Sequence, residues 1–360
     1  MSGGADRVLE VARLNGVFPA VAAALREVSG VGSDTLEALG RYQIQRAARE
    51  LCVREDLRWF AGQMAEAGLG WLTFKGPTVA RLLYHPDDLR TYQDLDLCLR
   101  RADFAAGIEA LEAAGAHILD RNWTLIRREG RGQLHLVLPL GTVADVHWHL
   151  LNRRAVRDSF AIDMDGVFER ARAVQLDGLA VRTLDPVDTL VHLGLHAALG
   201  GADRLMWMDD VRRSLLVEAP PWDEVIARAR AWRAASAAAV TFRRARLRLG
   251  APVPDDALIA LDGSRTRREI GAWIDGRWSE EASHGRRSLA ALWPQLVRDG
   301  AGATARTMLH RTAMPVLAVS HRLVGEPGLD HGAEVGAVFK ESGTAAERRR
   351  YLREVVSGTT

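Results

Sequence analysis

A run of strict alternation at residues 94–99 constrains the fold of this chain more than any other feature. In Asp94-Leu95-Asp96-Leu97-Cys98-Leu99 every second residue is leucine, which is the period of a half-buried β-strand. Residues 142–150 alternate in the same way, and Trp71-Leu72-Thr73-Phe74 is short, β-prone and bounded by glycine. Because helical spacing fills most of the remaining chain, the sequence predicts an α+β fold with a small mixed β-sheet.

Helical patterns flank these strands on both sides. Apolar residues recur every three to four positions over 5–68 and 101–114, and Asp185-Pro186 is a typical helix start. Antiparallel strands are also predicted at 124–128 and 133–138. We therefore expect three parts, a helical N-terminal segment, a central α/β core and a helical C-terminal region, at residues 1–68, 69–183 and 184–360.

The last third of the chain carries few chemical signals. Helical patches are predicted at 287–297 and 301–324, and residues 341–360 are expected to be frayed.

Composition excludes several classes of protein. The 360 residues include 48 basic and 46 acidic side chains, so the net charge of +2 gives no support to a protein that binds nucleic acid through bulk charge. The cysteines, Cys52 and Cys98, lack the spacing of a disulfide framework or a metal site. The N-terminus lacks the apolar core of a secretory signal, and no apolar run is long enough to span a bilayer. We expect a cytoplasmic protein that has no membrane partner.

The rarity of lysine draws attention to one position. Lys75 and Lys340 are the only lysines, and the other 46 basic residues are arginine. A lysine retained in such a background suits a role that needs a compact point charge.

The alternating run also places two carboxylates side by side. On a strand, Asp94 and Asp96 point to the same face, and their repulsion is costly to bury without a cation. A divalent ion removes that cost, and Mg²⁺ prefers oxygen ligands shared between carboxylates and phosphates. The alternative is a pair of solvated aspartates on an exposed strand face.

The surroundings favour the metal interpretation. Lys75-Gly76 lies at a strand-to-helix junction, where free backbone N–H groups can hold phosphate. Arg90 precedes Asp94 by four residues, and Asp145-Val146-His147 offers a third carboxylate on a second alternating strand. This order resembles the nucleotidyltransferase superfamily typified by DNA polymerase beta, and more narrowly a bacterial family of uncharacterised nucleotidyltransferases. The resemblance covers roughly residues 70–215.

The resemblance implies a reaction and a set of roles. Asp94, Asp96 and Asp145 would bind Mg²⁺, with Mn²⁺ as the alternative, and Asp145 would hold a second ion or take the acceptor proton. Further residues would bind the nucleoside triphosphate and its phosphates, namely Lys75, Gly76, Arg90 and His147. A nucleoside monophosphate would pass to a hydroxyl acceptor and pyrophosphate would leave. Related proteins accompany natural-product and modified-peptide gene sets, which indicates a small-molecule or peptide acceptor.

The sequence departs from the superfamily at one point and leaves alternatives open. Lys75-Gly76 stands where the superfamily usually has Gly-Ser, so the phosphate contacts do not carry over directly. The second functional hypothesis is an enzyme that adenylylates a protein, and the third is a non-catalytic nucleotide-binding scaffold. A nucleic-acid binder that uses the arginine-rich helix 236–249 would be a different class.

Several other residues have two interpretations. His147 and His149 share the predicted strand face of Asp145, and either assist proton transfer or are ordinary polar residues. His192 and His196 have a spacing that can bind metal, but helix packing is the simpler interpretation. A nucleotide-base pocket near Gly200-Gly201 would use Arg204, Trp207, Asp209 and Asp210, although Trp207 also suits the core.

Overall fold

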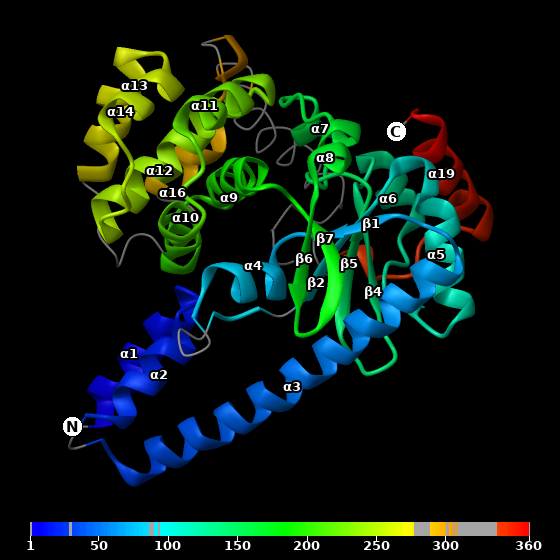
Figure 1. Ribbon diagram of the computed structural model, residues 1–360, viewed down its shortest axis with the longest axis horizontal. Helices are drawn as coiled ribbons and strands as arrows, with labels where there is room; N and C mark the ends of the chain where they lie inside the picture. Colours follow the sequence, from blue (N-terminus) through cyan, green and yellow to red (C-terminus); the bar gives the residue numbers. More distant parts are fainter. Residues whose placement is uncertain are drawn as a thin grey trace, which may run out of the picture.

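The computed structural model describes residues 2–28, 31–85, 90–92, 94–276, 289–299, 302–304, 307 and 337–359. The described chain has an N-terminal helical arm, a sheet covered by helices on both faces, and a group of C-terminal helices (Figure 1). This is the predicted α+β fold with a small mixed sheet. No helix among the described residues is long and apolar enough to cross a membrane.

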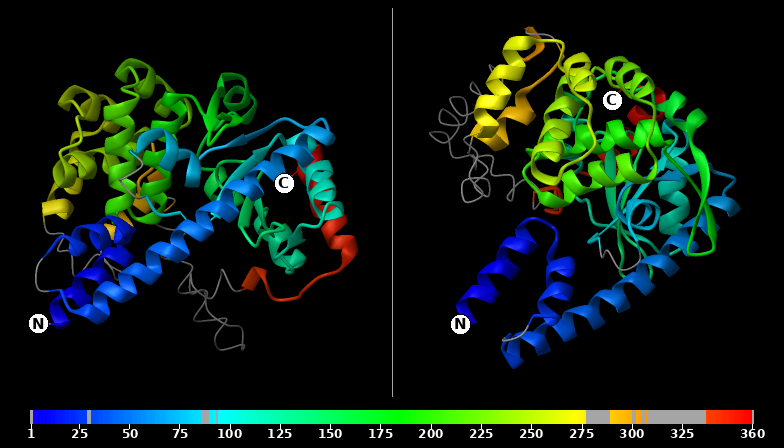
Figure 2. Two further views of the ribbon diagram at one scale, coloured as in Figure 1. Left: turned by 60° about the horizontal axis from the view of Figure 1, so that its bottom comes forward. Right: turned by 60° about the vertical axis from the view of Figure 1, so that its left-hand side comes forward.

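The N-terminal arm consists of α1 (Ser2–Leu14), α2 (Phe18–Arg26) and the 34-residue α3 (Ser33–Glu66). Leu9, Phe18 and Leu39 form a small core where the three helices meet. At 1.5 Å per residue α3 is about 50 Å long, and it runs from this core to the sheet, where Phe60 and Met64 are buried (Figure 2). The arm therefore has a core of its own and joins the sheet through one helix.

The central sheet has five strands in the order β1-β2-β5-β4-β3. Its strands are β1 (Trp71–Thr73), β2 (Asp94–Leu99), β3 (His117–Ile118), β4 (Gln133–Val137) and β5 (Val143–His147). β2 and β5 are parallel, and the other neighbouring pairs are antiparallel. The central pair is therefore the only place in this sheet where two chain directions agree.

The two faces of the sheet differ in chemistry. Leu95, Leu97 and Leu99 enter a core formed with α3, α5 (Phe104–Ala113) and α6 (Trp123–Glu129). Asp94 and Asp96 lie on the opposite face, as alternation requires, together with Cys98, which packs in the core of the C-terminal helices. The polar face of the sheet thus turns toward those helices.

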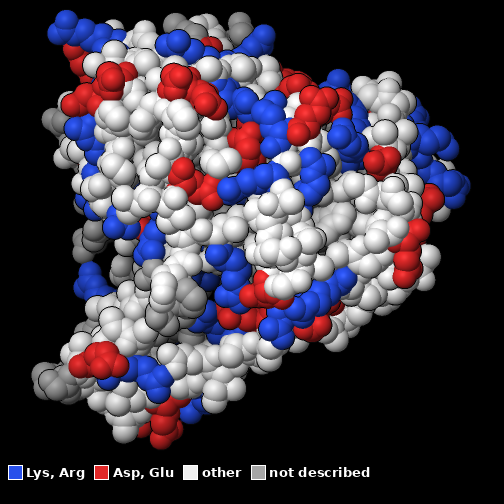
Figure 3. All heavy atoms as spheres, viewed as in Figure 1, with Lys and Arg blue, Asp and Glu red and all other residues white. Residues whose placement is uncertain are grey.

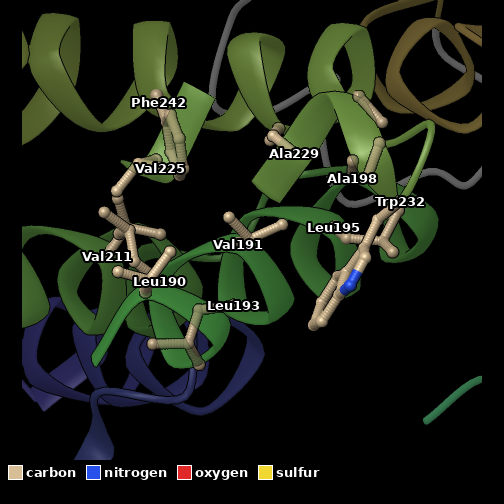
Figure 4. Packing of buried hydrophobic residues seen from close by; sticks show 14 of the residues in the cluster. Leu190, Val191, Leu193, Leu195, Ala198, Val211, Val225, Ala229, Trp232 and Phe242 are labelled. Carbon is tan, nitrogen blue, oxygen red and sulfur yellow. The ribbon is translucent and has the colours of Figure 1, made fainter. Parts of the chain in front are cut away.

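Helices α4 (Gly76–Leu83) and α9 (Pro186–Gly200) lie beside this polar face. The predicted start of α9 is confirmed, because the Asp185 side chain accepts a hydrogen bond from Asp188 N at 2.7 Å and Pro186 occupies the first turn. Leu190, Val191 and Leu195 of α9 pack among buried residues of the neighbouring helices (Figure 4). At Gly194 a Cβ atom would lie 2.7 Å from Phe242, so glycine allows this close packing.

The remaining helices enclose α9 or connect the strands. The C-terminal group contains α10 (Leu205–Val217), α11 (Trp222–Ala231), α12 (Ala235–Leu249), α13 (Asp255–Asp262), α14 (Arg265–Gly276) and α16 (Leu289–Leu296). The connecting elements are the short helix η1 (Arg101–Asp103), α7 (Arg154–Arg157), α8 (Met164–Arg170) and the hairpin of β6 (Arg172–Leu176) and β7 (Leu179–Thr183).

Three predictions about local structure were wrong. Residues 124–128 belong to helix α6, because Asn122 caps it by accepting a hydrogen bond from Leu125 N and Gly130 ends it in the left-handed conformation. His149 lies beyond the end of β5. The segment expected to be frayed contains α19 (Ala345–Ser357), which has a complete capping box and buries Tyr351 and Val355.

Helix α19, near the C-terminus, packs onto the core of the central sheet. It packs against α5 and α6 of the sheet core, far from the C-terminal helices that precede it in sequence (Figure 1). The boundaries at residues 68 and 183 remain a prediction. Most of the patch predicted at 301–324 falls outside the described residues.

Candidate active site

The central parallel pair of strands brings two aspartates together. Asp96 on β2 and Asp145 on β5 are register partners, so their side chains point to the same face at adjacent positions. Asp94 lies two residues before Asp96 on β2, opposite Val143, and is less buried than Asp96. The predicted convergence of acidic side chains from two neighbouring strands is therefore present for Asp96 and Asp145.

Two cationic or imidazole groups surround Asp96. Lys75 Nζ lies 2.6 Å from Asp96 Oδ1, and His147 Nε2 lies 3.3 Å from the same oxygen. The side chain of Asp96 is 5% exposed, and that of His147 is 2% exposed. Lys75 therefore supplies positive charge to the buried carboxylate of Asp96.

Asp96, Asp145 and His147 together form a possible metal site. One ligand atom of each lies within 4.8 Å of the others. Asp145 Oδ1 and His147 Nε2 are buried, and neither has a well-formed hydrogen bond among the described residues, although His147 Nε2 lies 3.3 Å from Asp96 Oδ1. Buried polar atoms without partners are rare in folded proteins, and two of them beside a carboxylate fit a bound cation. Asp94, which we predicted as a ligand, lies outside this group of three.

The carboxylates have opposite protonation preferences. Burial raises the pKa of Asp145 to about 7, and the charges of Asp96 and Asp94 contribute to this rise while His135 opposes it. Burial also acts to raise the pKa of Asp96, but Lys75 and His147 overcome it and hold that pKa below its usual range. Burial acts to lower the pKa of Lys75, but the charge and hydrogen bond of Asp96, together with the charges of Asp145 and Asp94, outweigh burial and leave that pKa raised. Asp96 and Lys75 are thus an ion pair at neutral pH.

The turn before α4 brings the backbone close to the acidic strand. Gly76 has φ +43°, and a Cβ atom there would lie 2.9 Å from the backbone oxygen of Asp94. Glycine is therefore required by both conformation and space. The first turn of α4 lies beside the Asp94 end of β2, and the free N–H groups of a helix start can hold an anion.

Arg90 connects this turn to the C-terminal helices. Its guanidinium donates to Asp210 on α10 at 2.6 and 2.8 Å, and to the Gly76 carbonyl at 3.0 Å. Tyr84 donates to the same aspartate at 2.7 Å. We predicted that Arg90 binds phosphate and that Asp210 lines a base pocket; in this structure the two residues bind each other instead. Their partnership had no signal in the sequence, because they are 120 residues apart.

Three further polar residues lie next to Asp145: Gln133 and His135 on β4, and Asp120 on the loop after β3. Gln133 Nε2 donates to Asp145 Oδ2 at 2.7 Å and lies 3.2 Å from His135 Nε2. His135 Nδ1 lies 2.9 Å from the buried Asp120. Sequence analysis missed all three residues, although period-two alternation along 133–137 places Gln133 and His135 on one face.

The histidines of α9 pack without forming a metal site. His192 is 2% exposed, and its ring meets Phe74 edge-on at 5.3 Å and stacks with His196 at 6.0 Å. Trp207 contacts His196 and covers Gly200, where a Cβ would lie 2.4 Å from the indole. The group of possible metal ligands found among the described residues includes neither histidine, which fits helix packing. His149 accepts a hydrogen bond from Leu151 N at 3.0 Å, away from Asp145.

Two arginines of the arginine-rich helix α12 form ion pairs inside the protein. Arg244 is fully buried, donates to Asp275 at 2.9 Å and caps the carbonyls of Gly201 and Ala202 at the end of α9. Arg243 binds the same aspartate at 2.9 Å. Basic and acidic side chains are interspersed over the face shown in Figure 3. These contacts oppose a role for this helix in nucleic-acid binding.

A mixed sheet with carboxylates on adjacent parallel strands, beside a glycine turn that opens a helix, is the arrangement expected of a nucleotidyltransferase. The model of a family described as uncharacterised nucleotidyltransferases matches residues 2–250, and the chain belongs to this family. The protein is therefore a transferase enzyme, and the resemblance is confirmed. The match extends through the N-terminal arm and α12, beyond the residues 70–215 that carry the motifs. No curated protein matches the chain.

Proposed function

We propose that this enzyme transfers a nucleoside monophosphate from a nucleoside triphosphate to a hydroxyl acceptor on a small molecule or peptide, with release of pyrophosphate. The observation that carries the proposal is the convergence of Asp145 Oδ1 and His147 Nε2 beside the carboxylate of Asp96; both atoms are buried and have no well-formed hydrogen bond within the part of the chain that the structure describes. These three residues fit a divalent ion. When bound, such an ion supplies charge neutralisation to the phosphates and to the attacking oxygen.

Residues of the chain bind the triphosphate and accept the proton of the acceptor hydroxyl. Lys75 and the first N–H groups of α4 lie on the β1 side of Asp96, where they neutralise charge on the triphosphate. Asp145 lies on the other side and accepts the proton of the acceptor hydroxyl. The hydroxyl oxygen forms a bond to the α-phosphorus, the bond from that phosphorus to the bridging oxygen breaks, and the electron pair leaves with pyrophosphate. Asp94, at the start of β2 on the same face as Asp96, adds a carboxylate for a second ion.

Ion identity follows from the ligand set. Carboxylate oxygens are suitable ligands for both Mg²⁺ and Mn²⁺, whereas an imidazole nitrogen is a better ligand for Mn²⁺ than for Mg²⁺. Because His147 takes the place that we predicted for Asp94, Mn²⁺ is a stronger candidate than the sequence alone indicated.

The proposal is tested with purified protein, α-labelled triphosphates, Mg²⁺ or Mn²⁺, and a panel of hydroxyl-bearing small molecules and peptides. We expect label transfer and pyrophosphate release, both abolished in Asp96→Ala. Asp165→Ala is the matched control, since Asp165 is 85% exposed and pairs with Arg100 at 3.2 Å on the surface. Label on the enzyme or on a second protein would favour protein adenylylation. Tight triphosphate binding without turnover on any acceptor would instead identify a scaffold and contradict the proposal.

A further inference from the structure

The two oxygens of Asp145 have different environments. Oδ2 accepts a hydrogen bond from Gln133 Nε2 at 2.7 Å, whereas Oδ1 is buried without a hydrogen-bond partner in the described chain. Oδ1 lies 3.6 Å from His135 Nε2, beyond hydrogen-bond reach. The carboxylate is therefore held at one oxygen and open at the other.

The amide of Gln133 has one satisfactory orientation. A 2.7 Å contact with a carboxylate oxygen requires the nitrogen, because the amide oxygen at that distance would place two acceptors together. The second N–H of the amide faces His135 Nε2 at 3.2 Å. In the neutral imidazole that nitrogen accepts, so in this form both amide protons have partners. Burial acts to lower the pKa of His135, but the hydrogen bond to Asp120 and the charges of Asp145 and Asp120 leave it raised, and protonation of Nε2 at lower pH removes this hydrogen bond.

Asp120 fixes the imidazole at its other end. Both carboxylate oxygens lie near His135 Nδ1, at 2.9 and 3.1 Å, so Nδ1 carries a proton and donates it. The same carboxylate accepts a hydrogen bond from the backbone N–H of His135 at 3.0 Å, and Asp120 is only 3% exposed. The side chain and backbone of residue 135 therefore have a common anchor on the loop that follows β3.

We propose that Asp120, His135 and Gln133 form a hydrogen-bonded chain of positioning residues that holds Asp145 Oδ2 and thereby presents Oδ1 to the divalent ion and the acceptor hydroxyl. This inference rests on the proposed function and adds three residues to it. Carboxylates that ligate metals are commonly held by such outer hydrogen bonds, and loss of one typically weakens metal affinity or activity about 10- to 100-fold.

The arrangement across the sheet supports this role. Gln133 and His135 are register partners of His147 and Asp145, so the four side chains share the polar face. Lys75 approaches Asp96 from the β1 side, and the chain approaches Asp145 from the β4 side. The site is thus bordered by the cation of Lys75 on one flank and by the amide donor of Gln133 on the other.

The test compares the full-length wild type with Gln133→Met, which keeps the side-chain length and removes the donor. Gln175→Met on the exposed face of β6 is the matched control. Mn²⁺ affinity is measured by the electron paramagnetic resonance signal of free Mn²⁺, and kcat and the KM for triphosphate are measured where turnover occurs. We expect Gln133→Met to weaken Mn²⁺ binding roughly 10- to 100-fold or to lower kcat by that factor. The KM is expected to stay within about threefold.

Two further variants separate positioning from folding. Gln133→Asn retains an amide that is one methylene short, so it should keep part of the affinity. Asp120→Ala combined with Gln133→Met should be no worse than Gln133→Met alone, because both act through one chain. Unfolding curves recorded for each variant identify any that fails to fold. If Gln133→Met does not fold, the Mn²⁺ affinity of Gln133→Asn tests the proposal in its place.

Failure of this inference differs from failure of the proposed function. If Asp96→Ala abolishes transfer while Gln133→Met matches the wild type in Mn²⁺ affinity and kcat, the positioning chain is wrong and the transferase stands. If no acceptor is turned over, Mn²⁺ affinity alone decides. A wild type that binds no Mn²⁺ overturns the inference together with the metal site.

Discussion

Removal of the Asp210 carboxylate should destabilise the protein far more than removal of its neighbour on the same helix. Asp210 is 2% exposed and Arg90 is 6% exposed, and the pair is bidentate at 2.6 and 2.8 Å. In Asp210→Ala the guanidinium keeps its charge but loses its partner, and Tyr84 loses its acceptor. Breaking a buried pair in this way costs about 3–5 kcal/mol in the free energy of unfolding. At about 2–4 °C per kcal/mol, the melting temperature should fall by roughly 6–20 °C.

Asp209→Ala supplies the control. Asp209 is 24% exposed and contacts Arg212 and Arg213 at 3.2 and 3.4 Å, so its removal should cost about 0–1 kcal/mol. The assay is denaturant and thermal unfolding of both variants and of the double variant Arg90→Met/Asp210→Leu. Replacing both charges with apolar groups should restore most of the lost stability. Equal stability of the two single variants, or a double variant that loses the sum of its single effects, would refute the reasoning.

Three further predictions concern the site itself. Metal affinity should fall about tenfold per pH unit below pH 7 and level off above it, because Asp145, whose pKa is about 7 without metal, must release its proton to bind; calorimetric Mn²⁺ titrations at several pH values check this. The wild type should bind Mn²⁺ more tightly than Mg²⁺, and His147→Asp should narrow the difference in competition titrations. Gly76→Ala should destabilise the protein by about 1–3 kcal/mol and lower kcat, since its Cβ meets the Asp94 carbonyl at a positive φ; Gly178→Ala, at a turn with open space, is the activity control.

Local patterns predicted the elements that present the site. Alternation along 94–99 fixed β2 and the face of its aspartates, and the Asp185-Pro186 start fixed α9. Both strands of the site carry an apolar face that must enter one core, but their pairing joins segments that are distant in the sequence. The strand and helix starts themselves depend only on neighbours in the sequence.

Other elements depend on competing or distant contacts. The segment 124–128 was predicted as a strand because the periodicity of so few residues is ambiguous. In the structure it is helical, with Asn122 as the N-terminal cap and Gly130 as the C-terminal cap. The hairpin of β6 and β7 was missed although Asp177-Gly178 supplies a typical turn, with φ of +49° and +82°. α19 was missed because its apolar face stabilises the helix only when it packs against α5 and α6, which are distant in the sequence.

Within the site, the residue types were predictable and their partners were not. Three carboxylates on alternating strands, Asp94, Asp96 and Asp145, indicated metal chemistry. Only the register of β2 with β5 shows that His147, expected to bind nucleotide, joins Asp96 and Asp145 in the group of possible ligands, which does not include Asp94. The pairing of Arg90 with Asp210, and of Gln133 with Asp145, follows from the packing of distant segments.

The most direct measurement of the metal site is pulsed electron paramagnetic resonance on the Mn²⁺-loaded protein. Direct coordination by His147 predicts the modulation of one imidazole nitrogen, which disappears in His147→Ala and persists in Asp94→Ala. Asp145→Ala should lose most of the bound Mn²⁺. A bound ion that shows no nitrogen coupling, or binding that survives loss of both Asp96 and Asp145, would contradict the site.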